Sequence, residues 1–508
     1  MSTLFRRKKE ERPRRESVES EGNKGGRRLS VDSTSTVGSS VAEKDAAPDY
    51  NLVHAQRIHA TRSSLLSSEA SSHSYRGILN VGIILLVMSN FRLAMDNIHK
   101  YGILVDFVKL SFLLEPRRWP ATTATVCLNV FMIISYLLER WAASFAKRGK
   151  RPPEVFIALL HTLNVLSLLI SPVIMIFTVR INPAAGMLMM LFDTIFFMKL
   201  ISYVFVNREL RRQYLADQAV ARGAATTAPA TPGPSSDSSP ERRQSEGQPH
   251  GVPGLLSLRY PENVTLSNLL FFIAVPTLCY ELNFPRAQRI RKGFLVRHIL
   301  QFCFFVLLIY VIADQYLVVG VRNSLRSLQR KDPLAIAERV VKLAVPNLYV
   351  WLLGFYCYFH LFLNIMAELT RFGDRLFYKD WWNSTTIDHF WRTWNLPVHN
   401  FMVRHIFYPL KHHGFSRSQS AIVIFLISGL FHELLISIPF RTFKLWAVVA
   451  MLAQIPLAHI TRRYFKDRQI GNVIFWLSIM LGQPMLVLFY YGDYTTRHPP
   501  EYSSSALG

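Results

Sequence analysis

Residues 420–439 read SAIVIFLISGLFHELLISIP, and this stretch decides what kind of protein the chain forms. It is an apolar run of about 20 residues, which is the length that a helix needs to cross a hydrocarbon core of ~30 Å. Two ionisable residues, His432 and Glu433, lie past its middle. Such groups are costly at that depth unless they face protein or a cavity, so they are functional by default.

Similar apolar blocks recur along the 508 residues, half of which are hydrophobic. A soluble protein of this length would be divided into domains of about 150 residues and would not need such blocks. We therefore expect an all-α, polytopic transmembrane protein with about nine spans. The eighth is short and is expected to be tilted or partly buried in protein. The expected spans are roughly 78–98, 121–139, 155–179, 186–206, 298–319, 342–366, 418–438, 444–460 and 472–491.

Composition divides the chain further. Residues 1–75 are rich in Ser, Arg and Glu, which predicts a disordered tail on the cytosolic side. The first four spans occupy 76–206, and the segment 207–262 is expected to be a flexible cytosolic linker because much of it is Ala, Thr, Pro, Ser and Gly. The remaining spans form a core over 263–494, and 495–508 is expected to be a lumenal tail.

The formal net charge of +24 does not indicate a nucleic-acid partner, because Lys and Arg collect beside the apolar blocks and no nucleic-acid motif is present. With a cytosolic N-terminus, most basic loops become cytosolic, as the positive-inside rule requires, although the basic loop expected at 320–341 violates it. Two formal glycosylation sequons begin at Asn263 and Asn383. Both are expected on the cytosolic side and therefore unmodified. The four cysteines lie in apolar surroundings, and no metal site is expected.

His432 and Glu433 do not belong to a zinc-protease motif, because the second histidine of H-E-x-x-H is missing. No G-x-S-x-G elbow, P-loop or dinucleotide fingerprint is present either. Adjacent helical residues point about 100° apart, so His432 could face a chamber while Glu433 holds a neighbouring helix. Ser428, four residues earlier, shares the face of His432. A neutral imidazole in apolar surroundings is suited to act as a general base.

The loop at 367–417 is unusual because it carries four tryptophans among many charges and histidines. It is either an interfacial aromatic belt or a folded, ligand-binding element at the membrane surface. Residues 377–383, FYKDWWN, match the pattern F-Y-x-D-W-W-N. This signature resembles that of the membrane-bound O-acyltransferase (MBOAT) family, in particular the acyl-CoA acyltransferases that esterify sterols or diacylglycerol.

Flanking residues distinguish the two branches that share this signature. Residues 276–286 (PTLCYELNFPR), 394–399 (WNLPVH) and 453–458 (AQIPLA) resemble the type-1 diacylglycerol acyltransferases. The sterol enzymes keep the P-T-L core but diverge after it. The resemblance covers about 75–494, and it implies an MBOAT fold with an intramembrane reaction chamber that acyl-CoA enters from the cytosol.

The resemblance also implies that His432 is catalytic and that Asn395 lies near it at the membrane boundary. Acyl-CoA and diacylglycerol are the implied substrates, no cofactor or metal is expected, and a homodimer in the endoplasmic reticulum membrane is implied. The signature residues either contact substrate or support the acyl-CoA entrance. The candidate substrate-binding residues are Phe377, Tyr378, Asp380, Trp381, Trp382, Asn383, Trp394, His399, Ser428, Glu433, Gln454 and Gln483.

An oxyanion formed during acyl transfer needs hydrogen-bond donors, and the amides of Asn395, Gln454 and Gln483 are candidates. The coenzyme A phosphates need cations near water, for which the loop offers Arg371, Arg375, Lys379, Arg404, Lys411 and His412. Two other functions stay open at this point. A sterol acyltransferase would run the same chemistry on another acceptor, and a lipid transporter or scramblase would use a polar group in a lateral chamber without acyl-CoA.

Overall fold

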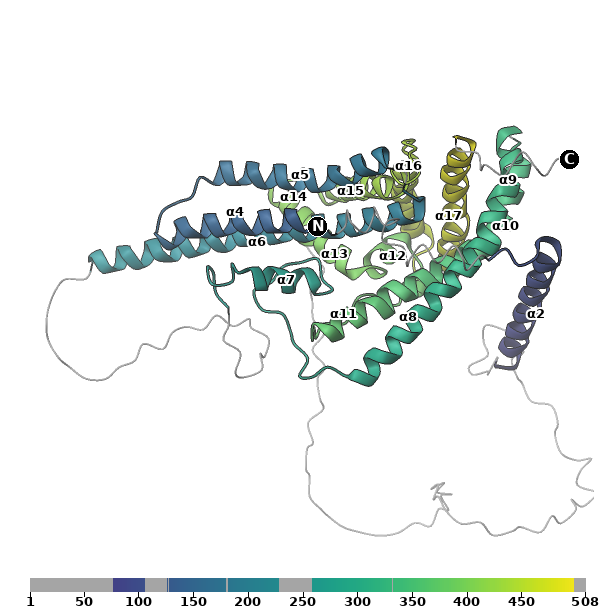
Figure 1. Ribbon diagram of the computed structural model, residues 1–508, viewed down its shortest axis with the longest axis horizontal. Coiled ribbons are helices and arrows are strands. Elements are labelled where there is room, and N and C mark those ends of the chain that lie inside the picture. Colours follow the sequence, from purple (N-terminus) through teal and green to yellow (C-terminus); the bar gives the residue numbers. More distant parts are fainter. Residues whose placement is uncertain are drawn as a thin grey trace, which may run out of the picture. The chain divides into compact units, whose positions relative to one another are not determined.

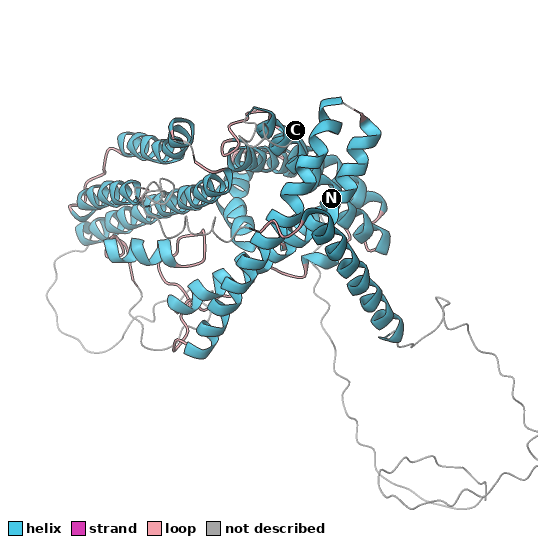
Figure 2. Ribbon diagram, turned by 45° about the vertical axis from the view of Figure 1, so that its right-hand side comes forward, coloured by secondary structure: helices cyan, strands magenta, loops and turns pink. Residues whose placement is uncertain are grey.

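The computed structural model describes residues 76–105, 126, 128–179, 181–227, 258–330 and 332–497. The predicted disordered tail, residues 228–257 of the predicted linker and residues 498–508 lie outside the described residues. Within the described ranges every regular element is helical and no strand occurs (Figure 2). An isolated antiparallel bridge joins Arg286 to Phe372. The prediction of an all-α membrane protein is confirmed.

The chain divides into two units, Met1–Val87 and Met88–Gly508. The described part of the first unit is the beginning of α2. The second unit holds the rest of α2 and the later helices. The elements are α2 (Arg76–Tyr101), α4 (Asn129–Lys147), α5 (Glu154–Thr178), α6 (Pro183–Thr227), α7 (Leu266–Ala274), α8 (Lys292–Ile312), η3 (Ala313–Val318), α9 (Val319–Arg330), α10 (Pro333–Phe355), η4 (Tyr356–Phe362), α11 (Leu363–Leu369), η5 (Trp381–Asn383), α12 (Ile387–Thr393), α13 (Leu396–Met402), η6 (Val403–Phe407), α14 (Tyr408–His412), α15 (Arg417–Ser437), α16 (Trp446–Tyr464) and α17 (Gln469–Arg497).

Seven helices among the described residues are long and apolar enough to cross a membrane. They are α2, α5, α6, the continuous helix α8–α9, the continuous helix α10–α11, α15 and α17. The predicted count of nine is not confirmed, because α4 and α16 are not among them. Each has 19 residues, and polar side chains such as Glu139 and Arg140 in α4 and Gln454 and His459 in α16 lower the mean hydropathy.

Two helices run further than the sequence indicates. Helix α6 continues through Thr227, whereas a flexible linker was expected from residue 207. Asn207 and Arg211 are 0% and 1% exposed, so the first turn of α6 beyond residue 207 is packed against protein. The helix that begins at Lys292 continues to Arg330 and α10 begins at Pro333, so nearly all of the loop expected at 320–341 is helical.

Helices α4, α5 and α6 run side by side (Figure 1), and their shared core includes Met132, Leu168 and Leu200. Helix α6 also packs on α15, where the rings of Phe197 and Phe431 lie 5.3 Å apart. Below this layer, Lys199 Nζ donates to two carbonyl oxygens at the end of α7, at 2.8 and 2.7 Å. The last carbonyls of a helix lack partners within the helix, so these two hydrogen bonds satisfy them and fix α7 against α6.

Three short segments, η3, η4 and η6, are π-helical, with more residues per turn than an α-helix. Each presents a polar side chain to a distant part of the chain. Gln315 Nε2 of η3 donates to Asn97 Oδ1 at 2.7 Å. His360 of η4 and His405 of η6 make comparable bonds near the candidate site. The π segments therefore mark places where the helical bundle is cross-linked by hydrogen bonds.

Candidate active site

Helix α15 carries His432, and a capping box between Ser416 and Gln419 stabilises the N-terminus of this helix. The Nδ1 atom of His432 lies 2.7 Å from the carbonyl oxygen of Ser428, and 3.4 Å from the hydroxyl of the same residue. A carbonyl can only accept, so Nδ1 carries the proton. The Nε2 atom makes no hydrogen bond to any described residue, and in this tautomer it is an acceptor. The geometry thus presents His432 as a base.

The direction of His432 follows from the faces of α15. Leu426 and Leu430 are 42% and 45% exposed and mark the outward face. His432 comes two residues after Leu430, roughly 200° around the helix, so it points inward. Phe425, seven residues earlier, shares the side of His432, and its ring meets that of Trp391 in α12 at 5.9 Å. His432 is half-buried on this face, which turns toward the 367–417 loop.

Glu433 is 1% exposed and faces another side of α15. Its carboxylate accepts from the backbone nitrogens of Leu445 (2.9 Å) and Ala447 (3.1 Å) at the start of α16. It also accepts from the hydroxyl of Tyr490 in α17 at 2.6 Å. Three protein donors occupy the carboxylate, so Glu433 braces α15 against α16 and α17, and the structure gives it no free oxygen for a substrate.

Close approach of α15 and α16 makes this brace possible. A Cβ at Gly429 would lie 3.3 Å from the Cα of Val448 and 3.4 Å from the Cβ of Met451. Leu445, which precedes α16, takes a left-handed conformation with φ of 59°. That conformation is unfavourable for leucine, and the bond from its nitrogen to Glu433 helps to hold it.

Tyr490→Phe is expected to destabilise the protein by about 1–3 kcal/mol, since a buried hydrogen bond to a charged group is lost. The thermal midpoint of unfolding in mild detergent measures this. Tyr491→Phe is the matched control, because its hydroxyl has no hydrogen-bond partner among the described residues and its midpoint should stay near that of the wild type. Equal midpoints for the two variants would contradict the bracing role.

Asn395, the second predicted catalytic residue, is the N-cap of α13, and its Oδ1 accepts from the nitrogen of Val398 at 3.1 Å. Its amide nitrogen has no acceptor among the described residues. The next nitrogen, that of Leu396, donates to the carbonyl of Phe377 at 3.0 Å and ties α13 to the signature. Asn395 and His432 share no hydrogen bond, so the structure places Asn395 as a cap with a spare amide donor.

The signature at 377–383 separates into buried and exposed residues. Phe377 and Trp381 are 3% and 2% exposed and belong to the apolar core. The hydroxyl of Tyr378 lies 2.9 Å from His360 Nδ1 of η4. Trp382 is 43% exposed, and Asp380 and Asn383 are exposed beside it. The signature is therefore a folding element with one polar, accessible edge.

Two other aromatic or imidazole candidates follow the signature. Trp394 stacks on Phe390, with ring centroids 5.6 Å apart. His399 is half-buried and lies one turn after Asn395. Burial, together with the cations of Arg392 and Lys379, lowers the pKa of His399. A second neutral imidazole thus lies near two positive charges.

The two candidate glutamines lie on α16 and α17. Gln483 Oε1 accepts from Asn347 Nδ2 of α10 at 3.3 Å, which bridges the two spans. Gln454 Nε2 reaches the carbonyl of Ala450 in its own helix at 3.5 Å, the limit of a hydrogen bond. Both side chains are half-buried.

Most of the predicted coenzyme A cations are already engaged. Arg371 donates to the carbonyls of Ala287 and Gln288, and Arg375 pairs with the buried Glu368. The other four candidates divide into two that are engaged and two that are available. Arg404 and Lys411 donate to backbone carbonyls, whereas Lys379 and His412 are exposed and have no ion-pair or hydrogen-bond partner among the described residues.

Tyr280 of the PTLCYELNFPR segment is the centre of a polar network that sequence reasoning missed. Its hydroxyl donates to Asn268 Oδ1 at 2.7 Å and accepts from Asn263 Nδ2 at 3.0 Å. Asn263 is 0% exposed, so this sequon asparagine is inaccessible to a glycan in the folded chain. The nitrogen of Tyr280 donates to Ser202 Oγ, and that hydroxyl bonds His405 Nε2, each at 2.8 Å.

His405 makes stability depend on pH. The Ser202 hydroxyl accepts from the nitrogen of Tyr280 and also bonds the half-buried imidazole of His405. Burial and the Arg404 guanidinium lower the pKa of His405 to about 4, from 6.5. Between these values the unfolded chain binds more protons than the folded chain, so this contribution to stability falls as the pH drops through that window.

We expect the thermal midpoint in detergent to fall between pH 7 and pH 4. His405→Gln should lose less over the same range, because it keeps an acceptor for Ser202 but cannot gain a proton. His412→Gln, at an exposed position, should follow the wild type. An unchanged pH profile in His405→Gln would show that other groups cause the loss.

Comparison with known proteins identifies a family to which the sequence is similar. A model of the membrane-bound O-acyltransferase family matches residues 158–492. Diacylglycerol O-acyltransferase 1 of Homo sapiens is 41% identical over 441 residues, which cover 86% of this chain and 84% of the relative. The Bos taurus protein of the same name is 40% identical over 456 residues, with 89% and 88% covered. That of Dictyostelium discoideum is 41% identical over 447 residues, covering 88% of this chain and 66% of the relative.

Proposed function

The chain belongs to the membrane-bound O-acyltransferase family, and from that premise we propose that it makes triacylglycerol by transferring an acyl group from acyl-CoA to diacylglycerol, with His432 as the base. It is an O-acyltransferase of the multi-pass membrane type. The observation that carries the proposal for the base is the Nδ1 hydrogen bond of His432 to a carbonyl, which leaves Nε2 as an inward-facing acceptor.

The proposed reaction is a direct transfer. His432 Nε2 takes the proton from the free hydroxyl of diacylglycerol as the oxygen attacks the thioester carbonyl. The tetrahedral intermediate then expels the thiolate of coenzyme A, and the proton on His432 passes to that sulfur. General base catalysis of this kind is worth about 10²–10⁴-fold in rate. In total, one ester bond is formed and one thioester bond is broken.

Donors for the developing oxyanion are proposed from the side-chain amides. Asn395 is the best placed chemically, because its oxygen is occupied as a helix cap while its amide nitrogen has no acceptor among the described residues. Gln454 and Gln483 remain candidates for lining the chamber. Glu433 acts indirectly, because it holds α15 in place through α16 and α17.

The location of both substrates follows from their polarity. Burying an acyl chain is worth about 0.8 kcal/mol per CH₂, so diacylglycerol and the acyl tail belong in the bilayer. Coenzyme A carries phosphates that stay near water and cations. Lys379 and His412 are the predicted cations that the fold leaves available, and Lys379 lies within the signature beside the exposed edge. We place the coenzyme A end of the substrate there.

The finer cellular assignments remain proposals. We place the protein in the endoplasmic reticulum membrane with its N-terminus in the cytosol, as the distribution of basic residues indicates. We also propose a homodimer, on the resemblance to the type-1 diacylglycerol acyltransferases.

The test is to express the chain in membranes that lack neutral-lipid synthesis and to supply radiolabelled oleoyl-CoA with either diacylglycerol or cholesterol. Label in triacylglycerol is the expected result. Label in sterol ester would move the protein to the sterol branch and leave the proposed chemistry intact. No ester from either acceptor, with folded protein present, would contradict the proposed function and favour another acyl acceptor or a transporter or scramblase.

A further inference from the structure

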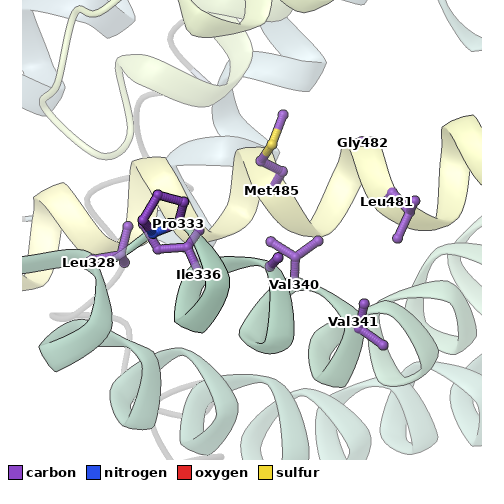
Figure 3. A pocket seen from close by; sticks show the side chains of 9 residues that line it. Leu328, Pro333, Ile336, Val340, Val341, Leu481, Gly482 and Met485 are labelled. Atoms are coloured by element: carbon purple, nitrogen blue, oxygen red, sulfur yellow. The ribbon is translucent and has the colours of Figure 1, made fainter. Parts of the chain in front are cut away.

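An apolar groove lies between α10 and α17, and neither His432 nor any other predicted site residue lines it (Figure 3). Its volume is about 700 Å³. The lining includes Ile336, Val340 and Val341 of α10 and Leu481, Gly482 and Met485 of α17. None of the nine lining residues carries a polar side chain.

The groove is open on the exposed side of α10 and α17. Gly482 leaves part of it unfilled, because glycine has no side chain. Val341, Leu481 and Met485 are 61%, 42% and 43% exposed, so the groove communicates with the surroundings of the helices. A Cβ at Gly482 would meet no atom within 4 Å. A larger residue at this position would therefore extend into the groove without displacing the backbone.

The groove lies on two helices of the membrane-spanning type. Both flanking helices, α10 and α17, belong to the spans that are long and apolar enough to cross a membrane. An acyl chain of the bilayer is the ligand that such a groove meets, and it gains van der Waals contact there that a flat helix pair would not offer. The volume is also within the ~300–1,000 Å³ of typical small-molecule sites.

One end of the groove is charged. A second hollow of about 450 Å³ shares Ala337 and Val341 with the first, and Glu338 and Lys342 line it. These two side chains form an ion pair within α10 and are 55% and 60% exposed. An exposed pair of this kind is worth little, so exchanging it for contacts with a ligand costs little. An acidic and a basic side chain next to each other complement a headgroup that carries one negative and one positive charge.

We propose that the groove and its charged end form a binding site for one zwitterionic glycerophospholipid of the bilayer. An acyl chain lies along α10 and α17 over Gly482, and the phosphate and amine of the headgroup pair with Lys342 and Glu338. No residue proposed for the acyl-transfer reaction lines this site, and its failure would leave the proposed function untouched.

The test uses the full chain in nanodiscs that contain phosphatidylcholine with a photoreactive diazirine on one acyl chain. After irradiation, peptide mass spectrometry should find adducts on 334–342 and 481–485. Gly482→Leu should lower these adducts at least about tenfold, the factor that corresponds to 1.4 kcal/mol. Adducts on the exposed leucines of α5, Leu159 and Leu163, serve as the internal standard and should not change.

Gly354→Leu is the matched control, because Gly354 also lies in α10 with nothing within 4 Å of a Cβ but does not line the groove. It should label like the wild type. The headgroup is tested with the double variant Glu338→Gln, Lys342→Gln and with a photoreactive diacylglycerol. The wild type should label more with phosphatidylcholine, and the double variant should lose this preference.

Three results would overturn the proposal. Equal groove labelling in Gly482→Leu and the wild type would show that no chain occupies the groove. Equal labelling by diacylglycerol and phosphatidylcholine in the wild type would show that the headgroup is not recognised. Cross-links between two copies of the chain at 481–485, without lipid adducts, would show that a second copy covers the groove.

Discussion

His432→Ala is expected to lower the rate of triacylglycerol formation by about 10²–10⁴-fold, because the proton acceptor for the attacking hydroxyl is lost. The change should appear in kcat, since the imidazole acts on the reacting atoms and contributes little to holding two long acyl chains. Initial rates with saturating oleoyl-CoA and diacylglycerol in detergent micelles measure it. Size-exclusion elution and thermal unfolding verify that the variant is folded.

Ser428→Ala sharpens this test, because it removes the hydroxyl at 3.4 Å from Nδ1 and keeps the carbonyl at 2.7 Å. The tautomer of His432 should therefore persist, and activity should stay close to that of the wild type. His459→Ala, at an exposed histidine of α16, controls for the loss of an imidazole elsewhere. Full activity in His432→Ala would refute its role as the base, whatever ester is formed.

Arg211→Ala is expected to cost about 3–5 kcal/mol of stability, the range for breaking a buried ion pair by removing one partner. Arg211 is 1% exposed, and its Nη1 donates to Glu139 Oε2 at 2.7 Å. Its Nε and Nη2 form a two-pronged contact with Glu154 at 2.9 and 3.1 Å. The residue joins α4, α5 and α6, so its loss leaves Glu139, which is 0% exposed, without its main cation.

Arg212→Ala removes the neighbouring guanidinium from an exposed position and should have a small effect. Arg211→Met combined with Glu139→Gln removes both buried charges and should recover much of the loss, because the penalty comes from the unpaired carboxylate. Thermal unfolding of the three variants in one detergent gives the comparison. Similar midpoints for Arg211→Ala and Arg212→Ala would contradict the structural role of the pair.

The sequence indicated His432 and Glu433 because ionisable residues are conspicuous within an apolar span. It could not assign the partner of Glu433. Tyr490 lies 57 residues later in another span, and a tyrosine there is also typical of a membrane interface. The partner depends on how α15 and α17 pack, which the pattern of either helix alone does not contain.

The partners of Arg211 could not be assigned from the sequence either. The cluster of Arg208, Arg211 and Arg212 lies at the start of the segment that the composition predicts to be a flexible linker. Arg211 lies instead in an extended α6, buried against carboxylates 57 and 72 residues away in sequence. Apolar periodicity sets where spans occur, but polar contacts between helices decide how far a helix such as α6 continues beyond them.

The π segments have a consequence for insertions and deletions. A π turn accommodates one more residue than an α turn while the helices on either side keep their phase. Deleting one residue within 356–362 is thus expected to restore α geometry and leave α10 and α11 in register, at the expense of the bond between His360 and Tyr378. The same deletion in the regular part of α10 would rotate every later residue of that helix by about 100°. Proteins of this family should therefore tolerate changes of length by one residue at 313–318, 356–362 and 403–407 more readily than elsewhere in their helices.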